Sequence, residues 1–243
     1  PTERLVSDWL HYGSVYVDGA RYRVDAQLTK DQIIRLHTKR KSYVTNPLHL
    51  ELAYDHPDFV ILNKPSGLPT HATLDNCIEN AQHLLSEKLK IPLYVTHRLD
   101  VATRGLLILA KSQKAQAALN KQFAKRQVEK FYRARVQSPV PCGLITHWMD
   151  PNSRVPKIMS ETPITGWWEC RLEILKDEDG LLNIQLHTGK THQIRAQLSA
   201  LGAPINGDTV YGSVMPARTG QIDLECQRLK FRWLQQDINV SLE

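Results

Sequence analysis

The chain has 243 residues, enough for one large domain or for a large domain with a small appendage. No apolar run approaches the roughly 20 residues that span a bilayer, and no basic and apolar leader opens the sequence, so we expect a cytoplasmic protein without a membrane segment. Cys77, Cys142, Cys170 and Cys226 are widely spaced, which favours reduced thiols over disulfides or a zinc site. The formal net charge of +6 suggests a polyanionic partner, because clustered Lys and Arg release counterions from phosphates.

Residues 1–46 differ in pattern from the rest of the chain. The stretch "LVSDWLHYGSVYVDG" predicts an amphipathic helix, a short strand and a glycine turn, and "QIIRLHTKRK" predicts a strand with a basic tip. The segment resembles the second half of the alpha-L RNA-binding motif without its first helix. Two interpretations stay open: a contact for RNA, or an appendage that only packs against the main domain, residues 47–243.

The first part of the main domain alternates predicted strands and helices. "FVILNKP" (59–65) predicts a short apolar strand that ends at Pro65, and "GLLILAKS" (105–112) predicts a buried strand. Residues 74–90 and 113–127 repeat apolar side chains with a helical period. The side chains expected on their buried faces are Leu74, Ile78, Ala81, Leu85 and Leu89 in the first helix, and Ala115, Ala118, Leu119 and Phe123 in the second.

The strand predicted by "KFYRARVQ" alternates cleanly. Tyr132, Ala134 and Val136 fall on one face, with Arg133 and Arg135 on the other. A tyrosine is thereby grouped with the buried side of the strand. Around it we expect a basic track for a polyanion. That track would consist of Lys121, Lys125, Arg126, Arg133 and Arg135.

The last third of the chain predicts a hairpin followed by a helix. "ECRLEIL", "KDEDG" and "LLNIQLH" read as strand, turn and strand, and "TGKTHQIRAQLSALG" as a helix capped by Thr191 and ended by Gly202. Strands are numerous and helices interrupt them irregularly. The predicted fold class is therefore α+β, with a mixed, mainly antiparallel sheet core and flanking helices.

The stretch "THRLDVATRG" places His97, Arg98 and Asp100 directly before a buried strand. Taken alone, it fits a structural ion pair in which one of the two cations holds the carboxylate. A protein-kinase catalytic loop also begins with His and Arg, but its aspartate follows at once, whereas Leu99 intervenes here. No glycine-rich phosphate loop precedes the stretch, so the kinase interpretation fails.

Several further blocks accompany this stretch in a fixed order. They are "LNKPSGLPTHA", "THRLDVATRGLLILAKS", "EKFYRARV", "TGKTHQIRAQL" and "INGDTVYG", followed by "LECQRLKF". Together they resemble the RluA-type family of RNA pseudouridine synthases over residues 50–231. The resemblance implies the pseudouridine synthase fold for residues 47–243 and the isomerisation of uridine in RNA. It further implies an enzyme without metal or other cofactor, which we expect to be a monomer.

The resemblance also implies roles for particular residues. Asp100 corresponds to the family's catalytic aspartate, and Arg98 to the arginine that helps to displace the target base. Tyr132 corresponds to the tyrosine that packs on the uracil. Arg195 corresponds to the basic residue that pairs with the aspartate, where a forked pair would keep Asp100 ionised and oriented. The loop that carries Lys64 and Pro65 is expected to line the same cleft.

Without the resemblance, plainer interpretations remain for these residues. Arg195 fits an exposed charge on a helix, Tyr132 a core tyrosine, and His97 a satisfied structural histidine without a proton-transfer role. Asp208 and Tyr211 are expected to be structural. In place of the serine common in the family the chain has Arg104, for which contact with phosphate and simple solvation both stay open.

Three functions compete at this stage. The first is an RNA uridine isomerase, the second a uracil glycosylase that also uses a carboxylate on a displaced base, and the third a catalytically silent RNA-binding assembly factor. The presence of Asp100, Tyr132 and Arg195 argues against the third, and the full set of blocks argues against the second. Large-subunit ribosomal RNA and transfer RNA are both candidate substrates, and the alpha-L-like segment favours the ribosomal one.

Overall fold

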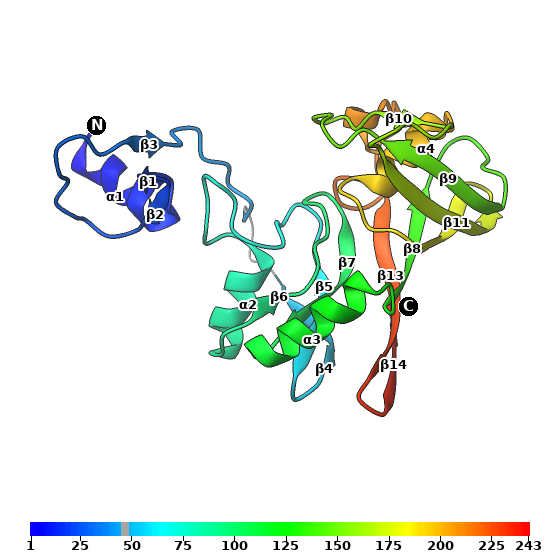
Figure 1. Cartoon of the computed structure of the whole chain (residues 1–243), viewed down its shortest axis with the longest axis horizontal. Helices are drawn as coiled ribbons and strands as arrows, with labels where there is room; N and C mark the ends of the chain where they lie inside the picture. Colours follow the sequence, from blue (N-terminus) through cyan, green and yellow to red (C-terminus); the bar gives the residue numbers. More distant parts are fainter. Residues whose placement is uncertain (45–48) are drawn as a thin grey trace.

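The computed structural model describes residues 1–44 and 49–243, so the expected domain boundary at residues 46 and 47 lies outside the described residues. A small N-terminal unit comes first (Figure 1). It consists of α1 (Glu3–Tyr12) and a three-stranded sheet of β1 (Val15–Val17), β2 (Ala20–Tyr22) and β3 (Ile34–Leu36). As the pattern predicts, α1 leads through a glycine turn into β1.

The rest of the chain is built on one eleven-stranded sheet. Its main order is β10-β9-β11-β12-β8-β13-β7-β5-β4, with β14 paired to β13 and β6 paired to β7. The strands are β4 (Glu51–Asp55), β5 (Phe59–Lys64), β6 (Tyr94–Val95), β7 (Arg104–Ala110), β8 (Glu129–Arg135), β9 (Gly143–Met149), β10 (Met159–Ser160), β11 (Trp168–Glu178), β12 (Leu181–Leu186), β13 (Leu224–Trp233) and β14 (Gln236–Ser241).

The pairings confirm the predicted fold class. Neighbouring strands of the large sheet pair antiparallel, with the exception of β13 and β7, which run parallel. The helices are α2 (Ala81–Leu89), α3 (Gln113–Ala124), α4 (Gln193–Ala200) and the short η1 (Thr209–Tyr211). Figure 1 shows α2 and α3 beside β4 to β7, and α4 beside β9 to β11, with β8 and β13 running between these two halves.

Gly105 makes the parallel contact possible. Its φ of +107° lies in the region that favours glycine, and a Cβ atom there would stand 2.4 Å from the carbonyl oxygen of Cys226 on β13. The strand that follows Gly105 is fully buried, as predicted, with Leu106, Leu107 and Ile108 all at 0% exposure. The loop that carries Asp100 is thus joined directly to the middle of the sheet.

Helix α2 is shorter than its sequence predicts. It begins at Ala81, with Asn80 as its N-cap, and Leu74 is 64% exposed. The helical prediction for residues 74–80 is wrong because the Asn76 side chain accepts hydrogen bonds from the amides of Ile78 and Glu79, which closes a tight turn. Similarly, α3 forms as predicted but Ala118 is exposed.

The N-terminal unit is hydrogen-bonded to that same turn-rich segment. Ser14 Oγ donates to the carbonyl of Asp75 at 2.6 Å, and the amide of Cys77 donates to the carbonyl of Tyr12 at 2.8 Å. The amide of Tyr43 donates to the Glu79 carboxylate at 2.6 Å. Residues 1–44 are therefore attached to the main domain, which agrees with either interpretation of this segment, RNA contact or packing appendage.

Helix α4 differs from expectation at its start. His192, not Thr191, is the N-cap residue, and it has a left-handed conformation with φ 60° and no side-chain capping bond. Gly202 follows the last turn, also with positive φ, as the sequence predicts. Across the described parts of the chain, no helix has the length and apolar character needed to cross a membrane.

Candidate active site

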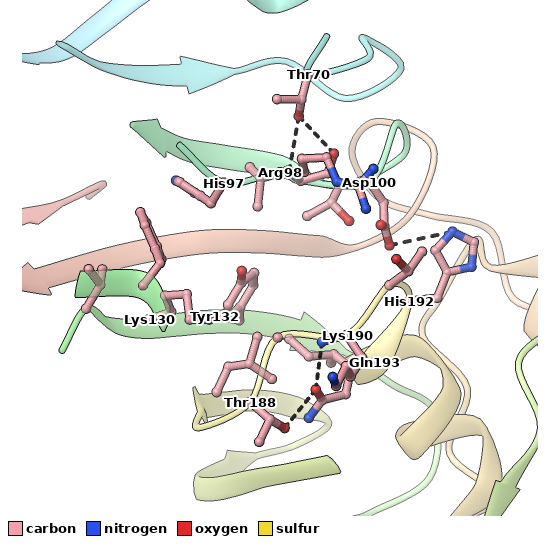
Figure 2. Close-up of a pocket in the computed structure, with 18 of the residues that line it drawn as sticks. Thr70, His97, Arg98, Asp100, Lys130, Tyr132, Thr188, Lys190, His192 and Gln193 are labelled. Carbon is pink, nitrogen blue, oxygen red and sulfur yellow. Dashed lines mark hydrogen bonds and ion pairs between the residues drawn. The ribbon is translucent and has the colours of Figure 1, made fainter. Parts of the chain in front are cut away.

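A cleft of about 1020 Å³ opens between the two halves of the large sheet. Four residues singled out from the sequence, Arg98, Asp100, Tyr132 and Arg195, line it together. They come from the loop before β7, from β8 and from α4, so the fold brings together positions far apart in the chain. Figure 2 shows Asp100 and Tyr132 within the same pocket.

The loop that carries Asp100 is held by the loop that follows β5. Thr70 Oγ1 donates to the Leu99 carbonyl at 3.0 Å and accepts from the Leu99 amide at 3.1 Å (Figure 2). The amide of Gly67 donates to the Val101 carbonyl at 2.8 Å. These bonds fix the backbone on both sides of Asp100, which limits where its carboxylate can move.

Lys64 stands behind this pair of loops. Its side chain is 0% exposed, and its Nζ donates to the carbonyls of Pro65 at 2.9 Å, Leu68 at 2.7 Å and Val101 at 3.4 Å. Burial lowers the pKa of Lys64 to about 7, against the attraction of Asp100. The lysine is therefore a clamp between the two loops.

The loop that carries Lys64 and Pro65 lines the cleft as expected, but Lys64 and Pro65 themselves are not among the residues that line it. The part of the loop that does so begins further on, at Pro69, Thr70 and His71. A lysine whose three donors all point at backbone carbonyls inside the protein has none left for a ligand.

Arg195 approaches Asp100, but the two guanidinium nitrogens that form its paired hydrogen bonds donate to Asp208. Nε and Nη2 donate to the two carboxylate oxygens of Asp208 at 2.6 and 2.8 Å, whereas Nη1 lies 3.6 Å from Asp100 Oδ2. The predicted forked pair with Asp100 is thus a forked pair with Asp208. Burial lowers the pKa of Arg195, but the hydrogen bond to Asp208 and the charges of both carboxylates outweigh it and raise the pKa.

The arginine is also buried, with a side chain only 7% exposed, so the interpretation as an exposed helix charge fails. Asp208 is 1% exposed and was expected to be structural. Its position shows what that structural role is: it neutralises Arg195 and fixes its plane, which leaves one nitrogen of the guanidinium facing Asp100.

Tyr132 lies on β8, between Ile184 of β12 and Cys226 of β13, and is 7% exposed. Burial and the neighbouring Cys226 raise the pKa of its hydroxyl well above the ordinary range. The hydroxyl is therefore uncharged, and the planar ring forms part of the cleft wall. Lys130, two residues earlier on the same face, also lines the cleft.

The other residues around "HRLD" have clear positions. Arg98 is exposed at the cleft. His97 Nε2 accepts from the amide of Ile108 at 3.0 Å, and burial lowers the pKa of His97 to about 3, consistent with the structural interpretation. Arg104 pairs with Glu225 at 2.8 Å across β7 and β13, a carboxylate partner that the sequence did not indicate.

The basic track is only partly where the sequence placed it. Arg133 and Arg135 are on the β8 face opposite Tyr132, and of the five expected cations only Arg126 lines the cleft. The cations that do line it are Arg98, Arg126, Lys130, Arg171, Lys190 and Arg195. Strand alternation could have identified Lys130, because it is two residues from Tyr132.

The segment between β12 and α4 contributes more than Arg195. Gln193 Oε1 accepts from Thr188 Oγ1 at 2.9 Å and from the amide of Lys190 at 3.1 Å, which holds the loop against the cleft (Figure 2). His192 lies 3.8 Å from Asp100, measured from Nε2 to Oδ2. The block "TGKTHQIRAQL" contained these residues, but the sequence alone gave no reason to choose among them.

Known structures share this architecture. The human RNA pseudouridylate synthase domain containing 1 superposes with a TM-score of 0.65 at 24% identity, over 80% of this chain and 83% of the human one. This likeness concerns the fold. The fold is thus that of the pseudouridylate synthases.

Sequence comparison gives the family. Residues 58–200, more than half of the chain, match the RNA pseudouridylate synthase family. The Arabidopsis thaliana protein named RNA pseudouridine synthase 6, chloroplastic, is 34% identical over 68% of this chain and 41% of its own length. The Xylella fastidiosa ribosomal large subunit pseudouridine synthase D is 29% identical over 90% of this chain and 69% of its own. The chain belongs to the RNA pseudouridylate synthase family, and it spans less than half of the length of the plant relative.

Proposed function

We propose that this protein isomerises uridine to pseudouridine in RNA. The observation that carries the proposal is the meeting of one carboxylate, Asp100, with the neutral ring of Tyr132 and the buried cation of Arg195 in a single cleft. Membership of the family supports the same conclusion.

The reaction changes connectivity without changing composition. The bond between N1 of uracil and C1′ of ribose breaks, a bond between C5 and C1′ forms, and the proton lost from C5 is balanced by one gained at N1. No oxidant or energy source enters. Asp100 would supply the carboxylate that acts on the substrate, and Tyr132 a flat face for the detached base, since stacking contributes about 1 to 3 kcal/mol per base.

Access to a uridine inside folded RNA requires the base to leave its stack. Arg98, exposed at the cleft beside Asp100, is positioned to occupy the space that the base leaves or to hold its phosphate. The other cations of the cleft would contact the backbone on either side.

We further propose large-subunit ribosomal RNA as the substrate class, with residues 1–44 as an additional RNA contact. The relative from Xylella fastidiosa carries ribosomal large subunit in its name. The N-terminal unit is hydrogen-bonded to Asp75 and Cys77, shortly after the cleft-lining Thr73. RNA that enters the cleft would therefore pass close to this unit. Transfer RNA as the modified species would contradict this assignment.

The decisive experiment follows tritium. Wild-type protein given RNA labelled at C5 of uridine should release tritium to water, because C5 becomes the new point of attachment to ribose. Asp100→Asn keeps the shape and much of the hydrogen bonding but loses the charge, so it should bind the RNA with similar affinity and release none. Near-normal release by Asp100→Asn would contradict the role given to Asp100.

Nucleoside analysis of the same RNA separates the competing functions. An isomerase leaves the RNA mass unchanged and gives pseudouridine, whereas a glycosylase releases free uracil and leaves an abasic site. A catalytically silent RNA-binding factor leaves uridine as it was. Only the first result agrees with the proposal.

A further inference from the structure

His192 approaches the Asp100 carboxylate, and the function proposed above gives it no role. It stands at the start of α4 with a left-handed backbone, φ 60°, a conformation that non-glycine residues seldom adopt and that concentrates at functional sites. Its Nε2 lies 3.8 Å from Asp100 Oδ2, and its side chain is 16% exposed (Figure 2).

The other ring nitrogen has a fixed partner. His192 Nδ1 lies 3.1 Å from the Tyr211 hydroxyl, and that same hydroxyl oxygen accepts the amide of Lys157 at 3.0 Å. A tyrosine hydroxyl has one proton, and within the described residues His192 is its one remaining acceptor. Donation of the Tyr211 proton to Nδ1 satisfies both groups, and it would place the proton of the neutral imidazole on Nε2, the nitrogen that faces Asp100.

The charge of the ring follows from its surroundings. Burial lowers the pKa of His192, and Arg195 and Lys157 lower it further, against the opposing effects of Asp100 and Asp208. At neutral pH the imidazole is then uncharged. Asp100 Oδ2 is thus approached by one full cation, Arg195 Nη1 at 3.6 Å, and by one neutral donor.

We propose that His192 is a positioning residue for Asp100, which donates a hydrogen bond from Nε2 to Oδ2 when RNA is bound. Both contacts to the carboxylate meet at Oδ2, so Oδ1 is left to face the substrate. Distances of 3.6 and 3.8 Å are longer than hydrogen bonds, and such contacts commonly tighten in the substrate complex. The proposal rests on the function proposed above.

Two substitutions of His192 distinguish the contribution of Nε2 from that of Nδ1. The amide nitrogen of His192→Gln takes the place of Nε2, whereas that of His192→Asn reaches only the place of Nδ1, although Asn tolerates the left-handed backbone better. With enzyme in excess over RNA, His192→Asn should lower the rate of tritium release about 100-fold, as expected for a displaced reacting group. His192→Gln should keep about a fifth of the wild-type rate. RNA affinity and the thermal transition should stay the same in both variants.

A double-substitution cycle tests the link through Tyr211. Tyr211→Phe removes the donor that fixes the tautomer, so it should slow tritium release about tenfold in the wild-type background. In the His192→Gln background it should have no further effect, because an amide has no tautomer to fix. Equal effects in the two backgrounds would show that Tyr211 acts independently of His192, which contradicts the proposal.

NMR of nitrogen-labelled histidine gives a reading that does not depend on turnover. At neutral pH the His192 ring should be neutral with its proton on Nε2. An Nδ1 proton, or a charged ring, would overturn the proposal. So would a His192→Asn rate equal to that of the wild type, or a His192→Gln rate as low as that of His192→Asn. Absence of tritium release from the wild type is a different result, which would reject the proposed function itself.

Discussion

Arg195 contacts two carboxylates, and the distances assign them different tasks. Asp208 accepts two hydrogen bonds and is 1% exposed, whereas Asp100 is reached only at 3.6 Å. An arginine that is already paired cannot swing fully to its second carboxylate. It stabilises the charge of Asp100 without covering both of its oxygens, which leaves a carboxylate oxygen free to face the cleft.

This arrangement predicts that stability and activity separate at Arg195. Arg195→Leu leaves Asp208 buried without a partner, so the free energy of unfolding should fall by about 3 to 5 kcal/mol. The double variant with Asp208→Leu removes both charges and should recover most of that loss, yet remain without tritium release. Chemical denaturation and the activity assay measure the two effects. A single variant as stable as the wild type would contradict the buried pair.

The sequence located residues that line this cleft, but it did not predict which of them contact one another. Motif blocks located Asp100, Tyr132 and Arg195, and alternation along β8 placed Tyr132 inward correctly. The fork from Arg195 to Asp208 could not be predicted, because it joins residues of different blocks through a fold that neither block encodes. His192 was hidden for the same reason.

At the scale of elements, the loop after β5 and the loop before β7 behave as one unit. Lys64, Ser66, Gly67 and Thr70 all bond to backbone groups of residues 99–102. Local patterns predicted β5, β7, β8 and α3 because each has its own signal: an apolar run in β5 and β7, alternation in β8, and a helical period in α3. Residues 74–80 escaped prediction because Asn76 closes a local turn there and because several of their hydrogen-bond partners, Ser14, Lys41 and Tyr43, are far away in the sequence.

The Lys64 clamp predicts a pH dependence of stability. Its pKa is about 7 in the folded protein and 10.5 as the ordinary value, so between these pH values the unfolded chain binds more protons than the folded one. Stability from this group therefore rises with pH from about 7 towards 10, by at most about 1.4 kcal/mol per pH unit. Denaturation of wild type and Lys64→Met across that range should show the difference shifting in favour of the wild type. A constant difference would mean that Lys64 keeps its ordinary pKa.

At the scale of the molecule, the formal net charge is +6. For RNA affinity, the positions of the cations matter more than their number. Arg126 lines the cleft, while Arg133, seven residues later, is on the opposite face of β8. Only cations near the bound strand neutralise its phosphates and release counterions.

RNA affinity should therefore fall with salt, and the two arginines should differ in how they affect it. Arg126→Gln should reduce the slope of log K against log salt by about 0.7, the value for one phosphate of a single strand. Arg133→Gln, with the same change of charge, should leave the slope as it is. Binding measured across a salt series gives both slopes. Equal reductions would show that affinity follows total charge and that the cleft is not the path of the RNA.

The position of β13 in the sheet determines when the cleft can exist. This strand, Leu224–Trp233, joins β8 to β7, yet nearly all of the other strands precede it in the chain. While the protein is being synthesised, the half with Asp100 and the half with Tyr132 remain without their common strand until residue 224 and its successors have been made. The cleft between the two halves therefore cannot be complete before residues 224–233 have been made, and a chain stopped before β13 would have two open sheet edges, on β7 and on β8.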